Sequence, residues 1–232
     1  MGYSVTSLGN ILEKHDGPVS VPEHAYTVLK NALLEGRLSP GDTLIQEEIA
    51  ASLGSSRVPI REALKRLEGE GLVVQRPRRG YVVASLNADE AEDVFDVRML
   101  LEERAGFLAT QKRTQADVDS VRKAMDEMVA IQSKGHYDSW AWGIANRAFH
   151  DRLFAPCNRP HLLRMLSQQR DLVTLYVRIG GSIAPDPETA AEDHLRIFDA
   201  YVRQDAAEVG RLSREHVHHT MTRLLAKLRD RA

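Results

Sequence analysis

Three histidines and one asparagine in the C-terminal half of the sequence could together bind a metal ion. Asn146 and His150 are four residues apart, so both side chains lie on one face of a helix. His194 and His216 lie in two later segments that also have helical patterns. Because a helical bundle can bring side chains from three helices to one interior point, these four residues could meet there. Three imidazoles and an oxygen donor suit Zn²⁺ or Ni²⁺ best, and Mn²⁺ or Fe²⁺ less well.

The same histidines could instead be ordinary core or surface residues. The separations of 44 and 22 residues between them are not a local metal-binding motif. His218 and His219 also offer alternative ligands on the same segment as His216. The spacing alone therefore favours a structural role.

A stripe of basic residues in the N-terminal third could contact DNA. Arg57, Arg61 and Lys65 are each four residues apart. Side chains one helical turn apart can reach guanine edges or phosphates on successive base pairs. The opposite face of this helix is apolar and carries Ile60, Ala63, Leu64 and Leu67. A solvated surface face is the alternative, because basic residues at this spacing are common on helices.

A basic turn follows this helix. Arg78, Arg79 and Gly80 lie between two extended segments at 72–74 and 81–83, which predict a β-hairpin. Such a tip can enter a minor groove or bind a phosphate. From Ser55 to Gly80 the sequence has seven Lys and Arg against three Glu, although the whole chain has a net charge of −2. The basic segment could therefore direct an anionic partner to one place.

The elements that would position this stripe form a recognisable order. A helix is predicted at 22–35, a short one ends at Gly54, and a third begins after Ser56, which is a good N-cap. Three helices followed by a basic hairpin are the order of a winged helix-turn-helix. Residues 1–21 show no periodicity and are expected to form a flexible arm.

The rest of the chain predicts only helices. Six helical patterns are separated by short breaks, at 89–111, 115–134, 137–155, 159–180, 187–203 and 206–230. Connections this short imply antiparallel neighbours. We therefore expect a mainly α protein, with a winged helix-turn-helix domain at 22–85 and an antiparallel six-helix bundle at 89–232.

Composition narrows the class of protein. Hydrophobic residues make up 43% and charged residues 28%, which is ordinary for a soluble protein with two modest cores. Cys157 is the only cysteine, so no intrachain disulfide can form and a reducing, cytoplasmic location is expected. No apolar run approaches the ~20 residues that span a bilayer.

Two segments resemble a known DNA-binding domain. The run from Leu38 to Val73 and the segment 79–83 are similar to the DNA-binding domain and wing of GntR-family regulators, over about sixty residues without a gap. The resemblance implies that Arg57 and Arg61 contact bases or phosphates of double-stranded operator DNA, with Gly80 assisting. Many members have Thr where this chain has Val58, so a hydroxyl contact is lost at that point.

Four segments of the helical part resemble the ligand-binding domain, called FCD, of the FadR branch of that family: 93–102, 146–150, 192–194 and 214–216. Six helices suggest the shorter, VanR-like subgroup. The resemblance implies a divalent metal held by His150, His194, His216 and a fourth ligand at position 146. The family usually has Asp there, whereas Asn146 is a neutral and weaker donor.

Arg98 has two interpretations. In the family pattern this arginine faces the cavity near the metal, where a guanidinium could pair with a carboxylate effector through two hydrogen bonds. Alternatively, Arg98 forms a surface ion pair with Glu102 one turn later.

The sequence thus predicts a transcription factor, and we expect a repressor controlled by a small organic acid. Tight operator binding requires two half-sites, which predicts a homodimer built through the helical domain. A metal-dependent enzyme is the alternative, although no His-Glu-x-x-His motif occurs and the only Glu-x-x-His is Glu215–His218. A third possibility is an adaptor whose winged helix binds protein.

Overall fold

The computed structural model describes residues 19–77, 80–85, 88–132, 139–179 and 187–229. The chain divides into two compact units. The N-terminal unit comprises residues 1–86 together with 171–181, and the helical unit comprises residues 87–170 together with 182–232. The predicted arm at 1–21 lies almost entirely outside the described residues.

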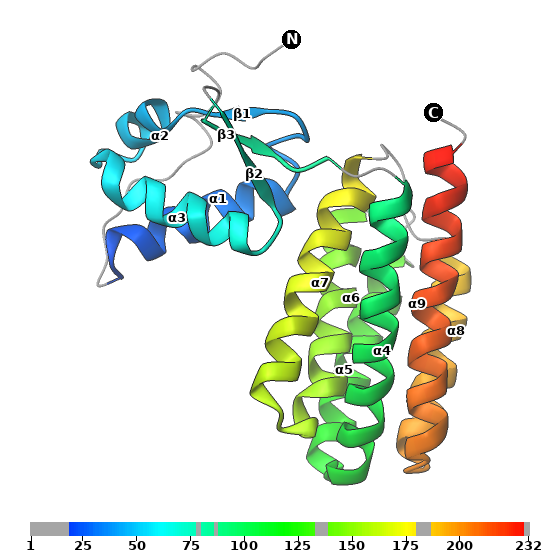
Figure 1. Ribbon diagram of the computed structural model, residues 1–232. Coiled ribbons are helices and arrows are strands. Elements are labelled where there is room, and N and C mark those ends of the chain that lie inside the picture. Colours follow the sequence, from blue (N-terminus) through cyan, green and yellow to red (C-terminus); the bar gives the residue numbers. More distant parts are fainter. Residues whose placement is uncertain (1–18, 78–79, 86–87, 133–138, 180–186, 230–232) are drawn as a thin grey trace. The chain divides into compact units, whose positions relative to one another are not determined.

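The N-terminal unit is a winged helix-turn-helix (Figure 1). Its elements follow in the order α1 (Val21–Leu34), β1 (Thr43–Leu44), α2 (Gln46–Ser52), α3 (Arg57–Gly69), β2 (Val73–Arg76) and β3 (Gly80–Val83). The three helices and the hairpin confirm the predicted fold class. The short strand β1 was not predicted, because two residues carry no detectable periodicity.

The three strands form an antiparallel sheet in the order β1-β3-β2. Leu44 of β1 pairs with Tyr81, and Arg76 of β2 pairs with Gly80. Gly80 has a φ of +72°, and a Cβ at this position would lie 3.3 Å from the Leu44 carbonyl oxygen. The hairpin therefore needs glycine here for its own conformation and packing.

Helix α3 packs through its apolar face, as predicted: Ile60, Ala63, Leu64 and Leu67 are buried. Ser56 occupies the N-cap position, as predicted, although its side chain makes no capping hydrogen bond. The backbone of Ser56 is extended, with a ψ of 166°, and the helix begins at the next residue.

Polar contacts attach α3 to α1. Tyr26 donates a hydrogen bond of 2.7 Å to Glu70, and Lys30 donates one of 2.8 Å to the same carboxylate. The Arg66 guanidinium lies 3.6 Å from the centre of the Tyr26 ring and pairs with Glu23 at 2.6 Å. These contacts fix the orientation of the helix that carries the basic stripe.

In the described part of the remaining chain there are six helices, as predicted, and their ends agree with the expected ones to within two residues. They are α4 (Ala88–Lys112), α5 (Gln115–Gln132), α6 (Ser139–Phe154), α7 (Pro160–Ile179), α8 (Pro187–Val202) and α9 (Ala206–Arg229). A 3-10 turn, η1 (Ala155–Cys157), follows α6 and ends at Asn158, which has a φ of +52°. The last part of α7 belongs to the N-terminal unit.

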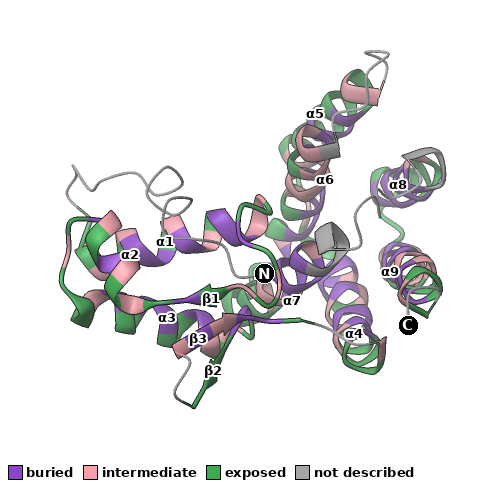
Figure 2. Ribbon diagram, turned by 90° about the horizontal axis from the view of Figure 1, so that it is seen from above, coloured by how far each residue is buried: buried purple, intermediate pink, exposed green. Residues whose placement is uncertain are grey.

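The core of the helical unit is rich in aromatic side chains. The largest fully buried ones are Trp142, Tyr201, Phe95, Phe149 and Phe154. In Figure 2 the buried sides of α4, α8 and α9 face neighbouring helices. Burying each such side chain stabilises the fold by about 1.5–3 kcal/mol.

Helices α4 and α9 approach closely at Gly210. A Cβ at this position would lie 3.0 Å from the Glu103 carbonyl oxygen, so no larger residue fits without movement. This close approach sets the distance between the buried polar residues that the two helices contribute further along their length.

Candidate functional site

Three of the four predicted metal-binding residues meet in the interior of the helical unit. His150 comes from α6, His194 from α8 and His216 from α9. One ring nitrogen of each lies within 4.8 Å of the others. All three residues are only 1–4% exposed, although they lie up to 66 positions apart in the sequence. The bundle therefore brings together residues that share no local motif.

The spacing of the ring nitrogens fits a divalent ion. The Nε2 atoms of His150 and His194 lie 3.3 Å apart. Zinc–nitrogen bonds of about 2.0–2.1 Å in a tetrahedral site separate two ligand nitrogens by roughly 3.3–3.4 Å. The His150–His194 pair thus has the spacing of two ligands of one ion, and the histidine cluster, defined as His150, His194 and His216, offers three donor nitrogens for Zn²⁺ or Ni²⁺.

Burial keeps two of these rings neutral. It lowers the pKa of both His150 and His194 well below the usual value, and the Arg170 guanidinium lowers that of His150 further. The neutral imidazole is the form that binds metals. The Nδ1 atoms of both rings are buried and have no hydrogen-bond partner among the described residues.

Asn146 lies one turn before His150 on α6, as the sequence predicts. Its Oδ1 atom is buried and has no hydrogen-bond partner within the described part of the chain. An orphaned buried oxygen is costly, and coordination of a cation would satisfy it. Asn146 therefore fits the role of a neutral oxygen ligand.

His216 has a further partner that sequence reasoning missed. Its Nδ1 atom lies 3.2 Å from Oδ2 of Asp193, and His219 Nδ1 lies 3.0 Å from the same oxygen. Burial opposes ionisation of Asp193, but the hydrogen bonds from the two histidines outweigh it and hold its pKa at about 2. The sequence did offer one signal for Asp193, because this carboxylate directly precedes the candidate ligand His194.

A second buried cluster contains two arginines and one carboxylate. Arg98 on α4 and Arg170 on α7 contact the same oxygen of Glu102, Oε1, at 2.9 and 3.2 Å. Glu102 is fully buried, and its Oε2 atom has no hydrogen-bond partner among the described residues. Burial raises the pKa of Glu102, but Arg98, Arg170 and His216 lower it more, so the net shift is downward.

Arg98 matches neither sequence interpretation completely. It does form an ion pair with Glu102, but the pair is buried rather than on the surface, since Arg98 is 6% exposed. Arg170 was not predicted, because a single arginine in an amphipathic helix carries no distinguishing pattern. Arg170 also pairs with Asp151 at 2.8 Å.

The basic stripe of α3 is exposed, as its pattern indicates. Arg57, Arg61 and Lys65 lie on the side opposite the buried apolar face. Arg57 pairs with Glu47 in the first turn of α2, and a backbone hydrogen bond together with this contact lowers the pKa of the Glu47 carboxyl. Within the described residues, Arg61 and Lys65 form no ion pair. These two side chains can therefore reach toward an external anion.

The predicted wing residues are only partly visible. Gly80 begins β3, whereas Arg78 and Arg79 lie outside the described residues. Arg76 at the end of β2 is exposed and adds a cation to the same hairpin.

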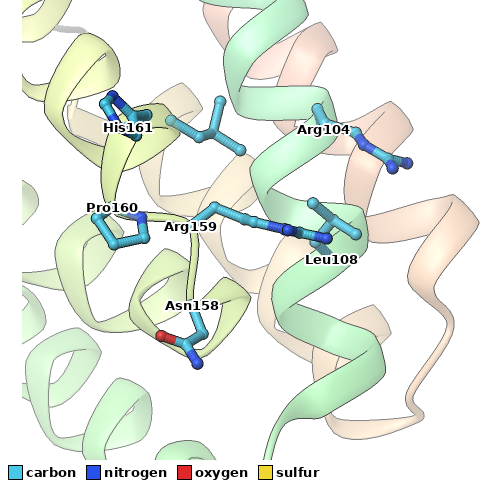
Figure 3. Close-up of a pocket in the computed structure, with 7 residues that line it drawn as sticks. Arg104, Leu108, Asn158, Arg159, Pro160 and His161 are labelled. Atoms are coloured by element: carbon cyan, nitrogen blue, oxygen red, sulfur yellow. The ribbon is translucent and has the colours of Figure 1, made fainter.

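A surface pocket of about 490 Å³ lies in the helical unit, and the residues that line it do not include the predicted site residues. Figure 3 shows Arg104 and Leu108 from α4 opposite Asn158, Arg159, Pro160 and His161. Its lining combines apolar side chains of Leu108, Pro160 and Leu162 with the cationic Arg104 and Arg159.

Comparison with protein families gives two matches. Residues 22–83 match the model "Bacterial regulatory proteins, gntR family", and residues 93–219 match the FCD domain. The FCD match alone covers more than half of the chain. The chain belongs to the GntR family of regulators and carries an FCD domain.

Curated relatives are helix-turn-helix transcriptional regulators. The regulator McbR of Escherichia coli is 30% identical over 162 residues, which cover 70% of each chain. The repressor GlaR of E. coli is 28% identical and covers 83% of this GntR-family chain and 90% of its own. The uncharacterized regulator YdhC of Bacillus subtilis is 26% identical, with coverage of 89% and 92%.

Solved structures share the fold. A GntR regulator from Rhodococcus sp. RHA1 superposes with a TM-score of 0.75 at 21% identity, covering 90% of this chain and 99% of its own. E. coli McbR/YncC gives a TM-score of 0.72 at 24% identity, with coverage of 92% and 99%. Within the described part of this regulator, no helix is both long and apolar enough to span a membrane.

Proposed function

We propose that this GntR-family regulator is a repressor whose affinity for operator DNA is controlled by a small organic acid, bound with a divalent metal in the helical domain. The observation that carries this proposal is the facing pair of neutral, buried imidazoles, His150 and His194, in an FCD domain. The repressor role is supported by the name of the relative GlaR, an HTH-type transcriptional repressor.

The DNA-binding surface comprises α3 and the hairpin. Arg61 and Lys65 supply base or phosphate contacts, and Arg57 joins them near the start of the helix. Arg78, Arg79 and Gly80 form the wing contact. We assign DNA binding to residues 22–85, and effector binding and dimerisation to residues 89–232.

The metal ligands in this proposal are Asn146, His150, His194 and His216. Zn²⁺ or Ni²⁺ suits three imidazole nitrogens and one oxygen. When bound, the ion supplies a concentrated positive charge to which a carboxylate can attach. The four neutral ligands of this chain leave that charge uncompensated within the coordination sphere.

The effector-binding arginine is Arg98. It lies on the buried side of α4 and shares Glu102 with Arg170. Guanidinium groups bind carboxylates through paired hydrogen bonds. A small anionic effector can therefore replace or supplement Glu102 as their partner.

The functional assembly is a homodimer. An interface on α4 is supported by the exposed apolar side chains of Val97 and Leu100, which are 45% and 62% exposed. Asp96 and Arg104 are also exposed, each four residues from Leu100. In a two-fold antiparallel pair of α4 helices centred at Leu100, Asp96 of one copy faces Arg104 of the other.

The pocket beside Arg104 supports the same interface. It lies between α4 and the start of α7, where a side chain from the second copy can enter (Figure 3). A self-complementary surface of this kind is what a two-fold dimer requires.

We also propose that the protein belongs to the VanR-like subgroup, on the basis of its six helices, and that it acts in the cytoplasm.

An enzyme using the histidine cluster is less well supported. The two buried carboxylates beside the cluster are already engaged, Glu102 by arginines and Asp193 by histidines. Neither is thus available as a general base.

Selection of binding sequences from a random DNA pool, followed by anisotropy titration, tests the proposal. We expect a two-fold symmetric sequence to be enriched. The affinity of the metal-loaded protein for this sequence should change when small carboxylic acids are added. The affinity of the metal-free protein should change much less. No enriched sequence, or an acid response that is unaffected by metal removal, would contradict the proposal.

A further inference from the structure

Asp193 occupies a distinct position beside the histidine cluster. It is 7% exposed and lies on α8 directly before His194, yet its carboxylate contacts α9. Oδ2 lies 3.2 Å from Nδ1 of His216. The Nδ1 atoms of His150 and His194 have no hydrogen-bond partner among the described residues. Of the three rings in the cluster, His216 is therefore the one whose Nδ1 contacts a carboxylate within the described part of the chain.

This contact determines how His216 presents its ring. Because ionised Asp193 can only accept a hydrogen bond, Nδ1 of His216 must carry the proton. The other nitrogen, Nε2, then has a free lone pair and points away from Asp193. A carboxylate in this position also makes the imidazole a stronger donor to a metal.

The charge of Asp193 matters as much as its geometry. Asn146 and the three imidazoles are all neutral ligands, so they provide no negative charge to a divalent ion. Asp193 is a buried anion one imidazole away from the ion's position. In an interior where screening is weak, a charge at this distance still stabilises a bound cation.

We propose that Asp193 is the positioning residue of the metal site: it fixes the Nε2-presenting tautomer of His216 and supplies, from outside the coordination sphere, the negative charge that Asn146 does not provide. This inference rests on the metal site proposed above. His219 is a second partner of the carboxylate: its Nδ1 lies 3.0 Å from the same oxygen, and its side chain is 36% exposed.

The test compares Asp193→Asn with the matched variant His219→Gln in the full-length protein. Zn²⁺ affinity is measured by competition with a chromophoric chelator, and the melting temperature of each metal-free variant reports on folding. We expect Asp193→Asn to weaken Zn²⁺ binding by about 10- to 100-fold, the usual effect of losing an outer carboxylate. His219→Gln should change it much less, because Asp193 and His216 remain in contact.

Long-range ¹H–¹⁵N spectra of the histidine side chains give a readout that a purely structural role would not change. In the zinc-loaded native protein we expect His216 to be protonated at Nδ1 and coordinated through Nε2. Adding Asn146→Asp to Asp193→Asn should restore most of the lost affinity, because the charge returns to the site.

The outcomes separate this inference from the proposed function. If the native protein binds no Zn²⁺ or Ni²⁺, the metal site itself is wrong, and the role of Asp193 fails with it. If the native protein binds zinc and Asp193→Asn binds it equally well, only the role of Asp193 is overturned. Coordination of His216 through Nδ1 would also overturn it.

Discussion

The Nε2 atoms of His150 and His194 lie 3.3 Å apart in the interior of the helical unit, on rings that burial keeps neutral. Two neutral imidazoles in this arrangement can share one proton or one metal ion. The nearby third ring of His216 and the orphaned oxygen of Asn146 favour the metal.

Metal binding should stabilise the fold, because the ligands come together only in the folded chain. Zn²⁺ at 100 times its Kd is expected to add about 2.7 kcal/mol to the free energy of unfolding. His194→Ala should abolish this increment, as measured by thermal melting with and without zinc. His161→Ala is the control, since His161 is exposed and outside the cluster. An equal zinc response in both variants would argue against the site.

Asn146→Asp should raise the affinity of the effector-free protein for metal, because it adds an anionic ligand. It should also reduce the dependence of metal binding on an acid effector, since binding free energies of metal and effector are coupled reciprocally. Calorimetric titration of Zn²⁺, with and without a panel of small carboxylic acids, measures both effects. Asn158→Asp adds the same charge outside the cluster and should leave both unchanged.

Arg61→Ala should reduce specific operator binding by about 1–3 kcal/mol, because the exposed guanidinium of Arg61 is available for a base or phosphate. The fold should survive, as Arg61 makes no ion pair among the described residues. Anisotropy titration at fixed salt compares it with Lys123→Ala, which removes an exposed charge from α5. Equal affinities for the two variants would refute the assignment of α3.

Glu102→Gln should destabilise the metal-free protein by roughly 3 kcal/mol, because it removes the buried carboxylate that Arg98 and Arg170 share, although Arg170 keeps its ion pair with Asp151. Small carboxylates should restore part of this stability by binding Arg98 and Arg170. Thermal melts with acetate or citrate against chloride at equal ionic strength measure the recovery. If no carboxylate stabilises the variant more than the native protein, the arginines do not form an effector site.

Leu100→Glu should convert the dimer into monomers, because the new carboxylates would face each other across the two-fold axis. Light scattering at micromolar concentration measures the mass. The matched control is Leu195→Glu, which changes a leucine that is 49% exposed on α8. A dimer that survives Leu100→Glu but not Leu195→Glu would move the interface to α8.

Most of the fold follows from local patterns in the sequence. The apolar spacing in α3 and in the six long helices is strong enough to place their ends within two residues. The short strand β1 and the turn η1 have too few residues for a pattern, and the missing side-chain cap at Ser56 depends on geometry that residue type does not determine.

The candidate site was harder to predict than the fold. His150, His194 and His216 were selected together through a family resemblance, because spacing alone favoured a structural role. Asp193, Glu102 and Arg170 gain their importance from contacts between helices that are distant in sequence, such as the 68 positions between Glu102 and Arg170. The DNA-contacting roles of the stripe residues remain predictions.

The ion pair between Arg57 and Glu47 affects how the proposed binding to DNA should depend on salt. A phosphate that binds Arg57 must displace a carboxylate that already neutralises it, so this contact exchanges one anion for another. It should therefore contribute less to the salt dependence of binding than Arg61 or Lys65, each of which adds nearly one displaced counterion per phosphate. Arg57 would then set the alignment of α3 on the duplex, while the other two supply most of the attraction that is independent of sequence.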